Sequence, residues 1–308
     1  MLSWIQPSPQ AIGKRVGMES SHPIAVEEAL VEEAYERLVS TKRRKALAFG
    51  ILFAGALAGS LLVSEVDPNK LMQGLPGFFD YGLRTVPVLH LKSLHRDLGE
   101  WYWGLGRWLN LLLDTFCIGF MATLLGTMGA LALCFPASRN LMNHFPVYFL
   151  SRRLLEIERA VPELVYALIF VFAFGLGPLP GVLAIAIHSM GALGKLFSEV
   201  NENIDLSSVE GVQAAGGNWF QVVRYAVIPQ VLPNFASYAL LRLEVNVRSA
   251  AIVGFVGAGG IGQELFFVIR QFIYTDVSAI VLLLIATVSL IDMTCERLRH
   301  YLIGRERQ

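Results

Sequence analysis

The sequence predicts an all-α protein that crosses a membrane six times, with both ends in the cytoplasm. Three observations lead to this prediction. The chain of 308 residues is 54% hydrophobic and 16% charged, with a mean hydropathy of +0.53, which is well above an ordinary soluble domain. The apolar residues gather in runs of about 15 to 25, close to the ~20 residues that a helix needs to cross a bilayer. Basic residues cluster beside these runs in a pattern that fits one topology.

The polar beginning of the chain, residues 1–45, is expected to form a cytoplasmic segment. Glutamates are frequent in Val26–Val39, which is predicted as a short helix. The segment ends in the basic cluster Lys42-Arg43-Arg44-Lys45, directly before the first apolar run. Because basic residues favour the cytoplasmic side of a membrane, this cluster places the segment inside. The apolar run 46–63, rich in Gly and Ala, is the first predicted span.

Residues 64–107 follow as an extracytoplasmic segment, expected to be interfacial helix and loop. Aromatic residues gather at its end, and these are Trp101, Tyr102, Trp103 and Trp108. Tryptophan and tyrosine are enriched where lipid meets water. The cluster is therefore predicted to form an aromatic belt at the membrane surface.

Five further apolar runs belong to a core at 108–297. The predicted spans are 109–134, 161–176, 181–194, 235–256 and 277–295. Arginines in the link after the second span and in the tail, 298–308, indicate the cytoplasmic side. The turn Gly175–Gly181 carries no charge, as an outside turn should. Six spans with cytoplasmic termini account for every basic cluster.

One long, moderately polar stretch, Val209–Phe235, interrupts the second half of the chain, in a predicted cytoplasmic loop at 198–234. We predict two short helices joined by a hinge at Gly216-Gly217. Two short helices between spans favour a docking surface over a pocket.

Local signals set the expected ends of these two helices. Ser207 or Ser208 would cap the first helix, and Gly216 would end it in a left-handed conformation. The second helix would run from about Trp219 to Tyr225 and end before Pro229.

The run Gly257-Ala258-Gly259-Gly260-Ile261-Gly262 satisfies the G-x-G-x-x-G pattern of dinucleotide-binding sites. That pattern requires a βαβ unit around it, whereas membrane spans flank it here. Irregular backbone at membrane depth is tolerated where protein buries it or where it lines a water-filled path. We therefore predict that Gly257, Gly259, Gly260 and Gly262 line a translocation path. A plain extracytoplasmic turn is the alternative.

The fifth span contains three charged residues, Arg242, Glu244 and Arg248. Each must face protein or water, because a charge near the middle of a bilayer costs roughly 2.5 to 3.5 kcal/mol on insertion scales. Glu244 and Arg248 are four residues apart and share a helical face. They either form an internal ion pair or line a path in which Arg248 attracts an anion.

Composition and motifs argue against several other classes of function. A net charge of zero gives no electrostatic basis for binding nucleic acid. The sequence Gly191–Lys195 resembles a P-loop but fails it, because Ser189 replaces the first glycine and Leu196 the magnesium-binding Ser or Thr. The six histidines lack metal-site spacing. We therefore expect no catalytic residue, no metal and no cofactor in this chain.

The polar stretch resembles the cytoplasmic loop of ABC-importer permeases, whose pattern is E-A-A, three residues, G, nine residues, I-x-L-P. Glu210 and Gly216 stand at the glutamate and the glycine, and Ile228-Pro229 stands at the final pair. Gly211 and Val212 replace the two alanines, and Ala226 replaces the isoleucine. The residues that this resemblance assigns to ATPase coupling are Glu210, Gly211, Val212, Ala215, Gly216, Ile228 and Pro229.

A wider resemblance, to the phosphonate-importer branch of these permeases, covers about residues 108–297. It includes Arg159-Ala-Val-Pro-Glu, Gly175-Leu-Gly-Pro, Glu244-Val-Asn-Val-Arg248 and 256–265. The resemblance implies a type I ABC importer permease fold in a bacterial cytoplasmic (inner) membrane, surrounded by lipid. It also implies a homodimer, two copies of a separate ATPase that bind ATP and magnesium, and an extracytoplasmic substrate-binding protein. The implied substrate is phosphonate, phosphite or phosphate.

Three functions remain open at this point. The first is a permease for phosphonate or a related phosphorus oxyanion. The second is a permease of the same architecture for another small solute, such as an amino acid, and the ligand of the binding protein would separate these two. The third is a stand-alone secondary transporter or membrane-embedded enzyme, which would need no ATPase partner.

Overall fold

The computed structural model describes residues 23–64, 67–87, 90 and 93–304, and within this part of the chain every regular element is a helix. The all-α prediction is therefore confirmed for these residues. The chain divides into two compact units, residues 1–76 and 77–308, and each is described by itself.

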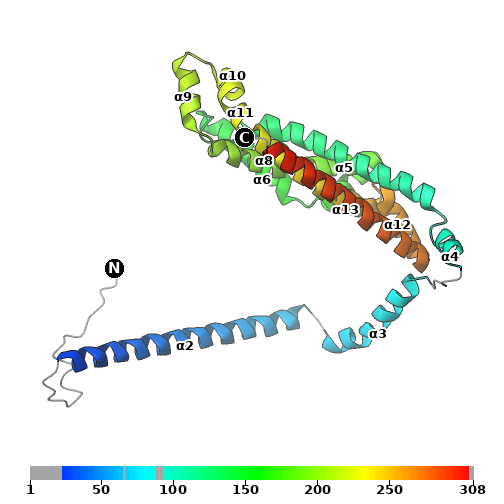
Figure 1. Cartoon of the computed structure of the whole chain (residues 1–308), viewed down its shortest axis with the longest axis horizontal. Helices are drawn as coiled ribbons and strands as arrows, with labels where there is room; N and C mark the ends of the chain where they lie inside the picture. Colours follow the sequence, from blue (N-terminus) through cyan, green and yellow to red (C-terminus); the bar gives the residue numbers. More distant parts are fainter. Residues whose placement is uncertain (1–22, 65–66, 88–89, 91–92, 305–308) are drawn as a thin grey trace. The chain divides into compact units, whose positions relative to one another are not determined.

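The first unit is dominated by one long helix, α2, which runs from Pro23 to Val63 (Figure 1). The prediction of a short helix followed by a separate first span is wrong in this respect, because the two are continuous. No proline interrupts α2 after its first residue, and its glycines stand singly among good helix formers. The stretch Glu32–Leu61 is long and apolar enough to cross a membrane. α3, Pro68–Thr85, follows and contains Pro76, where the two units divide.

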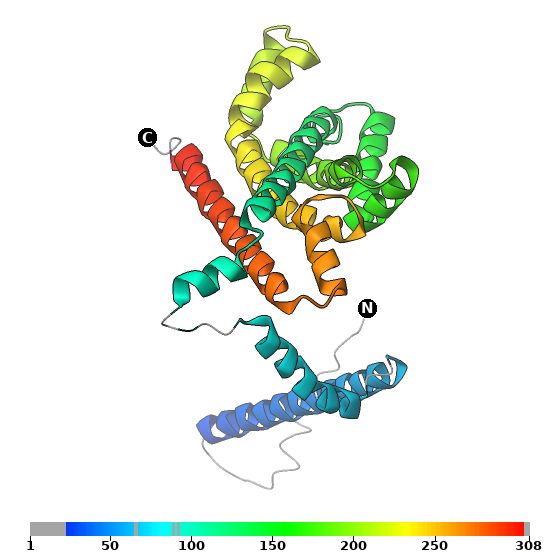
Figure 2. The ribbon, with the colours of Figure 1, turned by 90° about the vertical axis from the view of Figure 1, so that its right-hand side faces the viewer.

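The second unit is built around two long helices, α5 (Leu105–Cys134) and α8 (Pro178–Glu202), which pack along each other (Figures 1 and 2). Small residues permit this close approach. A Cβ atom on Gly126 of α5 would lie 2.8 Å from the Cβ atom of Ser189 on α8. Such contacts are typical of helix pairs in membranes, where small residues let two backbones come together.

α6 (Phe145–Ala160) and α7 (Glu163–Phe174) both pack on α8. α6 was not predicted from the sequence, and a span was predicted at 161–176. α7 has only 12 residues, fewer than the ~20 that cross a bilayer. The helix breaks at Val161, which is extended, because a residue before proline disfavours the helical conformation.

α11 (Ile228–Val253), α12 (Gly260–Arg270) and α13 (Tyr274–Gly304) complete the bundle. The chain bends by 45° where α12 begins, so that α11 and α12 resemble a broken span or a re-entrant loop. Among the described helices, four are long and apolar enough to cross a membrane, and the bent pair is a fifth candidate. The polytopic all-α architecture is confirmed, whereas the count of six spans and the side of the termini stay predictions.

The aromatic residues around α4 (Leu94–Trp101) attach it to the start of α13. Trp101 Nε1 donates a hydrogen bond of 3.1 Å to the Thr275 carbonyl, and Trp103 Nε1 donates one of 3.2 Å to an Asp276 carboxylate oxygen. Trp108 is only 1% exposed and belongs to a hydrophobic cluster with α12 and α13. The prediction of an aromatic belt is therefore wrong for Trp108, which packs inside the bundle.

Candidate functional sites: a projecting hairpin and a polar network

The polar stretch forms a hairpin, which we define as residues 205–230. It consists of α9 (Leu206–Ala214) and α10 (Trp219–Val222), followed by a π-helical turn, Val223–Val227, that leads into α11. Figure 1 shows α9 and α10 together at one end of the helix bundle. The predicted pair of short helices with a glycine hinge is confirmed.

α9 is capped by Asp205, one residue before the helix. Its carboxylate accepts hydrogen bonds of 2.9 Å from the Ser207 backbone N–H and 2.7 Å from the Ser207 hydroxyl. The prediction that Ser207 or Ser208 caps α9 is therefore wrong, since the helix starts earlier than its serines. The hydrogen bonds from the Ser207 side chain and backbone hold the pKa of Asp205 below its usual range.

Glycine at two successive positions makes the turn between the helices. Gly216 has φ of +81°, a left-handed conformation that glycine adopts at little cost, so its predicted role is confirmed. Gly217 donates its N–H to the Val212 carbonyl, 3.0 Å away. A Cβ atom on Gly217 would lie 2.6 Å from Cγ1 of Val212, so this residue must also be small.

Pro229 does not end a helix, contrary to the prediction. The chain stays helical from Trp219 to Val253, and Pro229 lies in the first turn of α11. A proline has no N–H and its ring clashes with the carbonyl four residues before it. The π-helical turn directly before Pro229 loosens this part of the backbone, which is how helices commonly absorb such an interruption.

Apolar side chains and one hydrogen bond fix the base of the hairpin to the bundle, and two further hydrogen bonds join the two ends of the hairpin to each other. Val209 and Val227 are buried in a cluster with Ala130 of α5 and Phe197 of α8. Trp219 Nε1 donates to the Leu141 carbonyl at 2.9 Å. The Gln230 side chain accepts from the Asp205 N–H at 3.0 Å and donates to the Asp205 carbonyl at 3.3 Å. The hairpin is therefore held rigidly to α5, α8 and α11.

The tip and outer face of the hairpin are exposed. Glu210, Gly211, Ala215, Gly216 and Pro229 are exposed, whereas Val212 and Ile228 are half-buried, and Val212 packs inward against the anchoring cluster. Phe220 and Tyr225, which are 75% and 65% exposed, were not predicted as site residues. The sequence did indicate them, because large apolar side chains in a polar loop favour a contact with another protein.

The glycine run after α11 folds back into the bundle. Gly257, Gly259 and Gly260 have φ of +92°, +81° and +71°. The Ile261 N–H donates to Thr115 Oγ1 of α5 at 2.8 Å. A Cβ atom on Gly262 would lie only 1.8 Å from the Ala251 carbonyl oxygen. The glycines thus permit a tight, mostly buried bend between α11 and α12, which differs from a plain exposed turn.

Glu244 and Arg248 each reach toward α13 rather than pairing their side chains with each other. Glu244 Oε1 lies 3.2 Å from Arg299 Nη2, and Arg248 Nη2 lies 3.8 Å from Asp292 Oδ1. Arg248 also donates from Nε to the Glu244 carbonyl. The expected mutual ion pair is therefore replaced by two pairs that join α11 to α13.

A polar network connects α5, α8 and α11 inside the bundle. Ser189 donates to Asn246 Oδ1 at 3.0 Å, and Asn246 Nδ2 donates to Thr123 Oγ1 at 2.8 Å. Arg242 Nε donates to Ser189 Oγ at 3.0 Å. Ser189 and Asn246 are fully buried. We call Thr123, Ser189, Arg242 and Asn246 the polar network.

Comparison with known proteins places these features in context. Residues 122–308 match the protein family described as binding-protein-dependent transport system inner membrane component. A phosphite transport system permease protein of Stutzerimonas stutzeri is 38% identical over 251 residues, which cover 82% of this chain and 87% of that protein. A permease named for the cryptic phosphonate transport system of Escherichia coli (strain K12) is 48% identical over 122 residues, covering 40% of this chain and 100% of that protein.

Among solved structures, the inward-facing methionine ABC transporter MetNI contains a chain with the same fold. The TM-score is 0.55 at 20% identity, and the match covers 63% of this chain and 95% of the other. At this identity the likeness concerns the fold alone.

Proposed function

This chain belongs to the family of binding-protein-dependent transport system inner membrane components, and from that premise we propose that it carries a small phosphorus oxyanion across the membrane with energy from a separate ATPase. Membership makes it a multi-pass inner-membrane permease of an ABC importer, and its fold is that of a type I importer permease. Relatives named for phosphite and phosphonate transport support the choice of phosphite, phosphonate or phosphate as substrate.

The hairpin is the proposed contact with the ATPase, and its geometry is the observation that carries this proposal. Its tip presents Glu210 and Gly216 to solvent, while its base is bonded to α5, α8 and α11. A push on an exposed tip with a fixed base moves the helices attached to it as a rigid body. ATP and magnesium would bind to the partner, because this chain lacks a P-loop.

The proposed assembly contains two copies of this chain, two ATPase subunits and one extracytoplasmic binding protein. Exposed apolar side chains on the bundle agree with cover by lipid or a second copy. Phe172 of α7 is 95% exposed, and Phe120 and Met128 of α5 are also exposed. Apolar surface of this extent marks a membrane or protein contact.

The proposed translocation path runs beside the bend between α11 and α12. The residues assigned to it are Glu244, Arg248, Gly257, Gly259, Gly260 and Gly262. Supporting this assignment, the bend is irregular backbone at the end of α11, the helix that also carries both charged residues, and such backbone occurs at membrane depth where protein or a water-filled path surrounds it.

Reconstituted uptake tests the proposed function. The permease would be purified with the ATP-binding and binding proteins encoded beside it and placed in liposomes containing ATP. We expect ATP-dependent accumulation of radiolabelled phosphite, phosphate or a small phosphonate, and no accumulation without the ATPase. ATP-dependent uptake of methionine but of none of these anions would overturn the substrate class, and uptake without any ATPase would overturn the mechanism.

A further inference from the structure

Polar residues recur every fourth position along α11. Gln230, Asn234, Tyr238, Arg242 and Asn246 form one stripe that winds slowly around the helix, because positions four apart are neighbours turned by about 40° from each other. We call it the α11 stripe. Its members bond to α8 and the loop after it at both ends, since Gln230 contacts Asp205 and Asn246 contacts Ser189. The seam between α8 and α11 therefore has polar contacts at both ends, on either side of an apolar cluster that contains Phe197 and Phe235.

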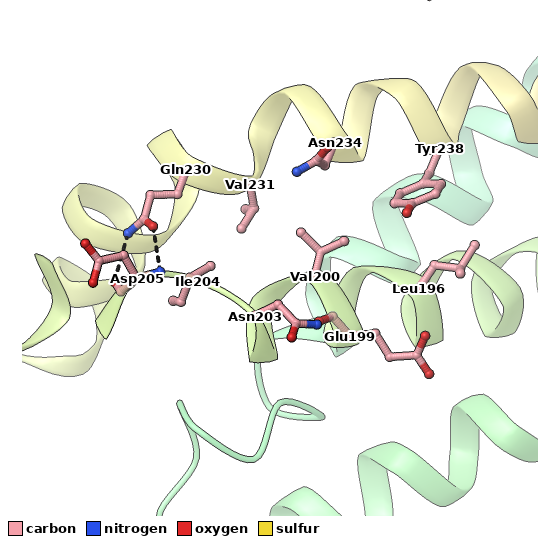
Figure 3. Close-up of a pocket in the computed structure, with 10 residues that line it drawn as sticks. All are labelled: Leu196, Glu199, Val200, Asn203, Ile204, Asp205, Gln230, Val231, Asn234 and Tyr238. Carbon is pink, nitrogen blue, oxygen red and sulfur yellow. Dashed lines mark hydrogen bonds between the residues drawn. The ribbon is translucent and has the colours of Figure 1, made fainter. Parts of the chain in front are cut away.

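The start of this seam is an open groove. Asn234 and Tyr238 line it from α11, while Leu196, Glu199 and Val200 line it from α8 (Figure 3). Its volume is about 410 Å³. Arg242 lies about one helical turn beyond Tyr238 and is not among the residues that line the groove.

Arg242 is the member of the stripe with an unused hydrogen-bond donor. Its Nε donates to Ser189, but its Nη2 atom is fully buried and has no hydrogen-bond partner among the residues that the structure describes. The carboxylate of Glu163 is near enough for an electrostatic interaction with Arg242. Its Oε1 atom, however, accepts a hydrogen bond from the Ser249 hydroxyl. Buried polar groups almost always have a partner, so an unpaired donor calls for an explanation.

Arg242 lies at a depth in the bundle where a charged side chain is unusual. It lies near the middle of α11, its partner Ser189 lies near the middle of α8, and Thr123 lies near the middle of α5. A charged group at that depth in membrane-spanning helices is costly and usually serves function. Arg248, by contrast, is half-exposed and has Asp292 as a charged partner.

We propose that Arg242, with Ser189 and Asn246, binds a small tetrahedral oxyanion inside the membrane. This inference rests on the proposed function and identifies the group that contacts the substrate inside the membrane. A guanidinium donates two parallel hydrogen bonds to an oxyanion, and here Nη2 is free to do so. The Asn246 amide keeps one N–H beside the one that it donates to Thr123, whereas the Ser189 hydroxyl must turn its hydrogen away from Asn246 to donate to an anion. The site is closed in this conformation.

Two variants at Arg242 and one control variant at Arg84 test the assignment in the complete reconstituted importer. Arg242→Gln removes the charge, Arg242→Lys keeps the charge without the planar fork, and Arg84→Gln is the control. Arg84 is an exposed arginine on α3 that pairs with Asp80, outside the region matched to the family. The readouts are phosphite uptake, ATP hydrolysis stimulated by the loaded binding protein, and thermal stability of the complex.

We expect uptake to fall at least about tenfold in Arg242→Gln, the effect of losing a charge-assisted hydrogen bond, while stimulated ATP hydrolysis stays within about twofold of the wild type. Uptake by Arg242→Lys should lie between the uptake of Arg242→Gln and that of the wild type, and uptake by Arg84→Gln should match the wild type. Preserved ATP hydrolysis with lost uptake is not the result of a merely structural role.

Two results would overturn the assignment. One is normal phosphite uptake in Arg242→Gln. The other is loss of assembly in Arg242→Gln together with full uptake by Arg242→Lys at unchanged apparent affinity for phosphite, which would make Arg242 a structural cation that a second copy of the chain satisfies. If instead the wild-type importer carries no phosphorus oxyanion, the proposed function fails, and that outcome is distinct from both.

Discussion

The hairpin and the polar network both place polar residues between apolar helices, but they are built in opposite ways. The hairpin depends on signals close together in sequence, namely the Asp205 cap, the left-handed Gly216 and the capping box of Asn218 with Gln221. Its tip is exposed and its base is fixed. The polar network depends on contacts between three separate helices, and three of its four residues are buried whereas Arg242 is half-buried. The difference indicates two distinct roles, with a rigid hairpin that can transmit motion at one end of α11 and a closed polar site near the middle of this helix.

The largest expected effect comes from a change at the glycine hinge of the hairpin. Gly216→Pro should abolish uptake, because proline fixes φ near −65° where the structure has +81°. Proline would also remove the N–H that donates to the Gln213 carbonyl at 2.9 Å. Substrate uptake and membrane insertion would be measured on the same cells, with insertion expected to stay normal.

Gly216→Ala is the matched control for that variant. No atom lies within 4 Å of the added Cβ, so only the left-handed backbone opposes alanine, at roughly 1 to 2 kcal/mol. Uptake should therefore fall only partly. If Gly216→Pro transports as well as Gly216→Ala, the hinge has no role in coupling.

A smaller effect is expected on the path side. Arg248→Ala should slow uptake several-fold without loss of assembly, because a positive charge beside the proposed path would be gone. Asp292→Ala removes the partner of Arg248 but leaves the positive charge in place. Uptake rates and size-exclusion profiles would be measured for both variants. An equal loss of uptake in Arg248→Ala and Asp292→Ala would show that Arg248 serves only to link α11 to α13.

The smallest expected effect is a pH dependence of the hairpin. Because hydrogen bonds lower the pKa of Asp205 in the fold, its contribution to stability is complete above the unfolded pKa of about 3.9 and is lost as pH falls through the folded value. Amide hydrogen exchange in α9 should therefore be faster in Asp205→Ala than in the wild type at neutral pH. The difference should shrink below about pH 4.

Asp205→Asn provides the comparison for the pH experiment. Asparagine caps helices as well as aspartate does but does not titrate. Its exchange rates in α9 should stay close to the wild type at neutral pH and show no such acid-dependent loss. An equal pH dependence in Asp205→Asn would mean that another group is responsible.

The sequence predicted the apolar helices well and their interruptions poorly. Both ends of α5 and the start of α13 lie close to the predicted spans, because long apolar runs dominate their local pattern, whereas α13 continues to Gly304, past the predicted end at residue 295. α6 and α12 were missed because they are short and carry charged or glycine-rich sequence. Pro229 was expected to end a helix, since the π-helical turn that accommodates it has no recognisable local pattern.

The hairpin and the polar network also differ in how far the sequence predicted them. Glu210 and Gly216 were predicted because they belong to a short motif in which local backbone conformation sets the residue types. Arg242 was noticed only as a charge, because its contact with Ser189 joins residues 53 positions apart. The four-residue spacing of the α11 stripe was visible in the sequence and indicated which side of the helix is polar. It did not indicate which helix packs there.

The coupling role of the hairpin is tested most directly by charge reversal at its exposed tip, with Glu210→Lys compared with Glu296→Lys. Glu296 is an exposed glutamate on α13, far from the hairpin in sequence. In the reconstituted importer, Glu210→Lys should insert normally but lose ATP-driven uptake and the stimulation of ATP hydrolysis by loaded binding protein, while Glu296→Lys keeps both. Normal uptake and normal stimulation in Glu210→Lys would contradict the account.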